Sequence, residues 1–161
     1  MSLTIRRARP GEAGLVLSLI RELAEYQKLD HQVEATGAMI DAALFGDNPQ
    51  LYCEIAEWAG EAVGFAIWFH NFSTFTGRPG IYLEDLFVRP AQRGKGIGKA
   101  LLIHLAKECV ANDWPRLQWT VLNWNTPAID FYKSLGADLL DQWTICRLEG
   151  SALTALAAGT R

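Results

Sequence analysis

A cluster of glycines and cations lies between residues 93 and 99. Its sequence is Arg-Gly-Lys-Gly-Ile-Gly-Lys, with an apolar run before it and a helical pattern after it. Glycines at the start of a helix let backbone N–H groups approach a phosphate, and the helix dipole favours the negative charge. The residue types and their spacing therefore predict a loop that binds a phosphate-bearing ligand.

Two well-known phosphate motifs do not fit this cluster. A P-loop needs glycine where Arg93 stands and serine or threonine where Ala100 stands. The dinucleotide fingerprint fails as well, because neither possible starting glycine places a glycine at its last position. The pattern that fits is Arg-x-x-Gly-x-Gly, formed by Arg93, Gly96 and Gly98.

This pattern resembles the pyrophosphate loop of the GNAT superfamily of N-acetyltransferases. Two further strings carry the resemblance, YLEDLFV at Tyr82–Val88 and NWNTPAIDFYK at Asn123–Lys133. With them, the chain from Leu3 to about Leu148 resembles the diamine branch, which holds the spermidine/spermine and thialysine acetyltransferases. The alternative is that the glycines merely form a tight turn, but three motifs in order and spacing favour the family.

The resemblance implies that acetyl-CoA is the co-substrate and that no metal is needed. The backbone of the strand at Leu86, Phe87 and Val88 is expected to pair with the pantetheine arm as an added strand would. Asn125, Pro127 and Ala128 match positions that flank the acetyl end, although Thr126-Pro127 is also typical of a helix start. The pyrophosphate is expected on the loop residues Arg93, Gly94, Lys95, Gly96, Ile97, Gly98 and Lys99.

Acetyl transfer to an amine needs a base, because an alkylammonium has no lone pair at pH 7. Glu84 is the candidate base, since it lies in an otherwise apolar strand where burying a carboxylate is costly without a role. The matching family position is assigned a base role, acting through water. The alternative is a carboxylate held by an internal salt bridge.

Tyr132 is the expected general acid for the departing thiolate. A phenol with a pKa near 10 is a plausible proton source for a thiol near 8.5, and the resemblance places this hydroxyl beside the sulfur. The alternative is a tyrosine that only packs. Direct attack by the amine requires no nucleophilic residue, and backbone N–H groups of the strand at Leu86 could polarise the thioester carbonyl.

The acceptor amine is expected to meet Glu84 together with four other residues. Asp85 would point to the opposite face of an ideal strand from Glu84, so both reach one site only if a bulge intervenes, as in the family. The animal polyamine enzymes carry glutamate where Gln27 stands, and residues 71–80 contain no acidic residue. A smaller amine or an amino-acid side chain is therefore expected in place of spermidine. The four residues are Asp85, Tyr26 and Gln27 at the end of the first helix, and Trp119.

The order of the elements predicts an α/β fold, a single domain over residues 1–161 with a mixed, strongly twisted sheet and helices on both faces. The Ala59-Gly60-Glu61 connection predicts an antiparallel hairpin, and residues 71–80 are expected to form a loop. Expected strands are Leu3–Arg9, Leu51–Trp58, Ala62–Phe69, Ile81–Val88, Leu117–Leu122 and Thr144–Leu148. Expected helices run from Pro10-Gly11 through Tyr26, from Thr36 to Phe45, from Gly96 to Asn112, from Ala128 to Leu135, and from Ser151 to Ala158. Thr126 is the expected cap of the helix at Ala128, and Pro127 is expected in its first turn.

Composition and charge narrow the class of protein. The 161 residues hold 15 Lys and Arg against 18 Asp and Glu, a net charge of −3, which argues against a nucleic-acid partner. No apolar stretch approaches the length of a membrane span. The three scattered cysteines are expected to be buried thiols in a reducing compartment, so we expect a cytoplasmic protein. Its histidines show no metal-ligand spacing.

The resemblance also implies a homodimer and an acetyl-CoA-dependent N-acetyltransferase that acts on a small-molecule primary amine. Two alternatives stay open at this stage. One is a non-catalytic acyl-CoA-binding or sensory module that retains the pyrophosphate loop. The other is an acetyltransferase for a protein lysine or N-terminus.

Overall fold

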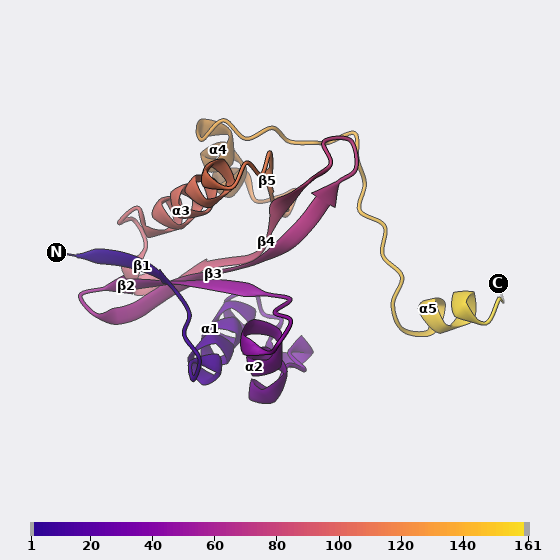
Figure 1. Ribbon diagram of the computed structural model, residues 1–161, viewed down its shortest axis with the longest axis horizontal. Coiled ribbons are helices and arrows are strands. Elements are labelled where there is room, and N and C mark those ends of the chain that lie inside the picture. Colours follow the sequence, from indigo (N-terminus) through magenta and orange to yellow (C-terminus); the bar gives the residue numbers. More distant parts are fainter. Residues whose placement is uncertain (1, 160–161) are drawn as a thin grey trace. The chain divides into compact units, whose positions relative to one another are not determined.

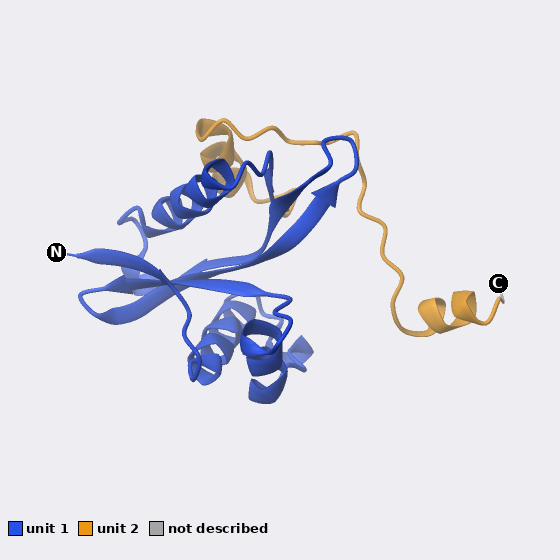
Figure 2. Cartoon of the chain, in the orientation of Figure 1, with its two compact units in different colours: residues 1–119 blue, residues 120–161 orange. Residues whose placement is uncertain are grey.

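A computed structural model describes residues 2–159 of the chain. The chain falls into two compact units, residues 1–119 and residues 120–161 (Figure 2), and each is described by itself. The first unit holds the sheet and the second holds two short helices. A single domain over residues 1–161 stays a prediction.

The sheet is mixed, as expected for this α/β chain. In the part of the chain that the structure describes it has five strands in the order β1-β2-β3-β4-β5. The first four are antiparallel neighbours, and β5 runs parallel to β4. The strands are β1 (Leu3–Arg7), β2 (Tyr52–Trp58), β3 (Glu61–Ser73), β4 (Arg78–Val88) and β5 (Leu117–Gln118).

Helices cover both faces of the sheet, which confirms the expected fold class. Figure 1 shows α1 and α2 on one face and α3 on the other. The second unit contains α4 and α5. The helices are α1 (Ala13–Tyr26), α2 (Gly37–Phe45), α3 (Ile97–Ala111), α4 (Thr126–Ser134) and α5 (Gly150–Ala157), with short 3-10 turns at Asp30–Gln32 and Pro90–Gln92.

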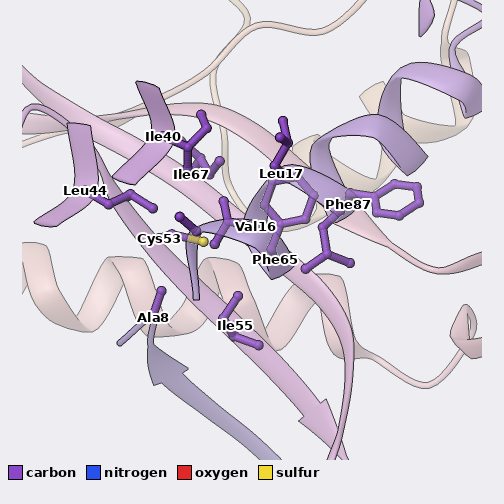
Figure 3. Packing of buried hydrophobic residues seen from close by; sticks show 12 residues of the cluster. Ala8, Val16, Leu17, Ile40, Leu44, Cys53, Ile55, Phe65, Ile67 and Phe87 are labelled. Carbon is purple, nitrogen blue, oxygen red and sulfur yellow. The ribbon is translucent and has the colours of Figure 1, made fainter. Parts of the chain in front are cut away.

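The main hydrophobic core lies between the sheet and the α1 and α2 helices (Figure 3). Cys53 and Ile55 of β2 point into it, because alternate residues of a strand share a face. Phe65 and Ile67 of β3 add to the same face. On the opposite face, α3 buries the expected stripe of Ile97, Leu101, Leu105 and Cys109.

Local sequence signals set several element boundaries as expected. The Thr36 side chain accepts a hydrogen bond from the Met39 N–H and caps α2. The β2–β3 hairpin turns through Ala59 and Gly60, which both have positive φ, at 53° and 86°. Two successive positive φ values are typical of the tight turns that suit the twist of a hairpin.

Three expectations about strands were wrong. Residues 71–80 do not form a loop: β3 and β4 continue as a ladder to Ser73 and Arg78, and only a tight turn joins them. Ser73 closes that turn, because its carbonyl accepts the Gly77 N–H and its hydroxyl accepts the Thr76 N–H. The expected strand Leu117–Leu122 pairs only at Leu117–Gln118 and is half-buried.

The expected strand Thr144–Leu148 has no regular structure, because an alternating pattern forms a strand only where another strand satisfies its backbone groups. Cys146 in this segment is exposed, whereas Cys53 and Cys109 are buried as expected. The expected cap of the helix near residue 128 was also wrong. The side chain of Asn125, and not that of Thr126, accepts the Ala128 N–H.

A buried carboxylate joins β1, β2 and α3. Glu54 has no exposed surface, and both of its oxygens accept the Nε–H of Arg7, at 2.9 and 3.0 Å. His104 Nε2 of α3 lies 3.6 Å from the same carboxylate. A buried charge is tolerated only when it is paired, so Arg7 is needed to keep Glu54 inside the fold.

Replacing Arg7 by methionine is expected to lower the free energy of unfolding by about 3 kcal/mol, because the buried charge of Glu54 loses its arginine partner and keeps only His104 beside it. Arg7→Met/Glu54→Met should recover most of the loss, since no buried charge remains. Urea unfolding followed by circular dichroism measures both. The matched control is Arg9→Met, at an exposed arginine two residues away. Equal losses in Arg7→Met and Arg9→Met would contradict the assignment.

Candidate active site

The glycine cluster forms the connection between β4 and the start of α3. Gly96 is the N-cap of α3 with φ +77°, and Gly94 has φ +79°. Such angles favour glycine, because a Cβ atom is strained there. No side chain caps this helix, and the first N–H groups of a helix have no partner within it. The loop therefore offers backbone donors and the positive end of a helix dipole to an anion.

Arg93 and Lys95 add positive charge to this loop, but each side chain already has a partner. Arg93 Nε donates to the Val88 carbonyl at 3.0 Å, and its guanidinium lies 4.1 Å from the centre of the Tyr26 ring. Lys95 Nζ donates to Gln92 Oε1 at 2.6 Å and lies 4.8 Å from the centre of the Trp58 ring. Lys99 is exposed on the first turn of α3.

The end of β4 leaves backbone groups available on one side, apart from the Val88 carbonyl that accepts Arg93 Nε. Its ladder with β3 continues through Val88, whereas β5 pairs with β4 only at Ile81 and Tyr82. Within residues 2–159, no strand ladder accompanies Leu86, Phe87 and Val88 on the β5 side. An extended ligand with amide groups can add to such an edge as a strand. The residues present thus fit the pantetheine arm and the pyrophosphate of acetyl-CoA.

The bulge implied by the resemblance is present in β4. Ile67 of β3 pairs with Asp85 and the next residue, Trp68, pairs with Leu83, so Glu84 is the extra residue. The bulge interrupts the alternation that would separate Glu84 from Asp85. The expectation that Glu84 is buried was nevertheless wrong, since its side chain is exposed. The extra residue of a bulge does not follow the alternation that packs the other side chains of the strand.

Asp85 is the more buried of the two carboxyl groups. Burial, and to a smaller extent the negative charge of Glu84, together raise its pKa to about 6. A carboxyl group with a pKa near the working pH exchanges a proton more readily than one that is fully ionised. The bulge thus brings together one exposed carboxylate and one with a raised pKa.

Three further residues expected on the amine side belong to the first unit: Tyr26, Gln27 and Trp119. Tyr26 ends α1 with 58% of its surface exposed, beside Arg93 and with its ring centre 6.4 Å from that of Phe87. Gln27 is the C-cap of α1 and is exposed. Trp119 is half-buried just after β5. The structure therefore brings Tyr26, Phe87 and Arg93 together.

The other expected residues belong to the second unit. Asn125 caps α4 by accepting the Ala128 N–H at 3.3 Å, and Pro127 occupies the first turn, where its missing N–H costs nothing. Tyr132 lies on the same helix and is half-buried, and burial raises the pKa of its phenol. That phenol is therefore protonated at neutral pH, as a general acid must be.

Residues that the sequence analysis did not single out hold the first unit's site together. Arg89 makes a two-point ion pair with Glu22 of α1, at 2.9 and 2.8 Å, and donates to the Ala62 carbonyl. This pair fixes the end of β4 against α1. Neither residue lies in a recognisable motif. The sequence signal that could have pointed to this pair is the position of Arg89, directly after the expected strand Ile81–Val88.

The described residues hold no group of three or more His, Cys, Asp or Glu side chains that could bind a metal ion. Among the helices of residues 2–159, none combines the length and the apolar character that crossing a membrane requires.

Comparisons with known proteins point to one family. Residues 16–137 match the model of the Acetyltransferase (GNAT) family. Thialysine N-epsilon-acetyltransferase from Sus scrofa is 41% identical over 167 aligned positions, which cover 97% of this chain and 98% of that protein. L-ornithine N5-acetyltransferase from Arabidopsis thaliana is 43% identical over 93 positions, 58% of this chain and 41% of that protein.

The fold is also shared with solved structures. An integron cassette protein from the mobile metagenome of V. cholerae superposes with a TM-score of 0.82 and 31% identity, covering 98% of both chains. An aminoglycoside acetyltransferase from an uncultured soil sample has a TM-score of 0.75 at 24% identity, covering 92% of this chain and 97% of that one.

Asp85→Asn is expected to stabilise the protein above pH 6. The folded-state pKa of about 6 exceeds the ordinary value of 3.8, so the wild type loses stability as pH rises between these values. The variant avoids this loss and should gain about 1 to 2 kcal/mol at pH 8, after allowance for solvent. The gain should disappear below pH 4. Urea unfolding at several pH values measures it, and a gain that grows on acidification would contradict the raised pKa.

Proposed function

Because this chain belongs to the GNAT family and is an N-acetyltransferase, we propose that it moves the acetyl group of acetyl-CoA to the primary amine of a small molecule. The acceptor class comprises diamines, polyamines and amino acids with a side-chain amine. The observation that carries the proposal is the loop at Gly94 and Gly96, which offers backbone donors to an anion directly after a strand edge that no ladder covers.

The reaction is a direct attack of the amine nitrogen on the thioester carbonyl carbon. The new C–N bond forms as the C–S bond breaks, the amine loses a proton and the thiolate gains one. Glu84 is the proposed base, acting through water. It is exposed and therefore accessible to both water and amine. Backbone N–H groups near Leu86 are proposed to stabilise the carbonyl oxygen.

Asp85 is proposed to bind the ammonium form of the acceptor beside Glu84. A cation next to Asp85 favours its ionised form and lowers its pKa from about 6. Two neighbouring carboxyl groups can thus hold the amine and take its proton in turn. Tyr26, Gln27 and Trp119 stay proposed amine-side residues on the resemblance.

The proposed acceptor is an amino acid with a short side-chain amine. Two relatives are named for thialysine and for L-ornithine, each an amino acid with such a side chain. In this chain Gln27 is uncharged and the β3–β4 hairpin tip, residues 73–78, has no acidic residue. Fewer carboxylates suit an acceptor with fewer positive charges than spermidine.

The proposal is tested by measuring free-thiol release from acetyl-CoA with thialysine, ornithine, lysine, diamines, spermidine and short peptides. Turnover concentrated on the amino acids supports the proposal. Turnover only with peptides would replace it by a protein acceptor. Saturable acetyl-CoA binding without thiol release from any amine would refute it and favour a non-catalytic module.

Tyr132→Phe tests the proposed general acid. We expect kcat to fall by about 100-fold or more, because protonation of the leaving thiolate contributes at least this factor. The dissociation constant of acetyl-CoA should change less than twofold, because the ring is retained. Steady-state kinetics and calorimetric titration measure the two quantities. The matched control is Tyr82→Phe, at another half-buried tyrosine. Unchanged kcat in Tyr132→Phe would remove it from this role.

The cytoplasmic location and the homodimer stay predictions. Sedimentation of the purified chain at several concentrations tests the dimer.

A further inference from the structure

Two cations of the glycine loop, Arg93 and Lys95, each lie against an aromatic ring from a different element. Tyr26 comes from the end of α1 and Trp58 from the end of β2. The distances from cation to ring centre are 4.1 Å for Arg93 and 4.8 Å for Lys95. Both lie within the range in which a ring face attracts a cation.

The Tyr26 ring is held in place by its own contacts. It lies beside Phe87, which is buried in the core, and the α1 helix that carries it is fixed to β4 by the Glu22–Arg89 ion pair. More than half of Tyr26 is nevertheless exposed. A large exposed ring that contacts a guanidinium is thus held against the sheet by contacts of its own.

Arg93 keeps donors available while it lies on this ring. Its Nε donates to the Val88 carbonyl, which orients the guanidinium plane. Within residues 2–159 its two terminal nitrogens donate to no protein group. These two nitrogens can bind two phosphate oxygens end-on in a two-point geometry.

A long flexible side chain loses rotamer freedom when it binds a ligand. A cation already held near its binding position loses less, so the complex is tighter. We infer that Tyr26 and Trp58 are positioning residues that hold Arg93 and Lys95 at the glycine loop for the phosphate groups of CoA. The inference rests on the proposed function for the identity of the anion. It adds a cofactor role to Tyr26, which the resemblance places on the amine side.

The central experiment is calorimetric titration of the full chain with CoA, which needs no turnover. Tyr26→Leu is expected to weaken CoA binding about two- to fivefold, the factor that corresponds to an exposed cation–π contact. Tyr26→Phe should retain most of the affinity, because it keeps the ring face. Trp58→Leu should behave like Tyr26→Leu. The control is Phe75→Leu, at a fully exposed ring in the β3–β4 turn, which should leave affinity unchanged.

A double-mutant cycle separates positioning from a general structural effect. Tyr26→Leu should have no further effect in an Arg93→Met background, because the cation that the ring holds is gone. Trp58→Leu should likewise have no effect in Lys95→Met. Repeating the titrations with 3′-dephospho-CoA identifies the phosphate: losses that persist assign the cation to the diphosphate, and losses that vanish assign it to the 3′-phosphate.

Three results would overturn the inference. One is an equal loss for Tyr26→Leu with and without Arg93. Another is an unchanged CoA affinity in Tyr26→Leu with a raised KM for the amine, which would leave Tyr26 on the amine side only. After either of these two results, CoA binding by the wild type would still support the proposed function. The third is absence of CoA binding by the wild type, which refutes the proposed function as well.

Discussion

The backbone of β4 is the constraint on which the first unit depends. Every buried N–H and C=O group needs a partner, and β3 supplies one side of β4 at every residue except Glu84. On the other side the β5 ladder ends at Tyr82, just before the bulge at Glu84. A bulge twists its strand and ends pairing. One extra residue thus opens the strand edge, groups two carboxyl side chains and directs the chain into the glycine loop.

The sequence predicts the parts of the site that depend on local rules. Gly94 and Gly96 have the positive φ that their clustering indicates, and the α3 stripe from Ile97 to Cys109 is buried. Thr36 caps its helix for the same reason, because a short hydroxyl side chain reaches the N–H groups of the first turn. These features need only neighbours along the chain.

Features that depend on distant partners were beyond such rules. Exposure of Glu84 follows from a register shift against Ile67, which the alternation of a single strand does not reveal. The β3–β4 ladder through residues 71–80 depends on cross-strand pairing, whereas the polar residues of this segment indicated a loop. Asn125 and Thr126 are both residue types that can cap a helix, so the sequence alone does not decide between them.

The Glu22–Arg89 ion pair has a consequence for the dynamics of α1. It joins the helix to the strand that leads into the glycine loop, and Tyr26 and Arg93 make a second link one turn later. Elements tied in this way open together in local unfolding. A ligand that binds only the closed form adds its binding free energy to the cost of that opening. Amide hydrogen exchange in the last turn of α1 should therefore slow when a ligand binds the loop, so this helix end would report occupancy of a loop more than sixty residues away in sequence.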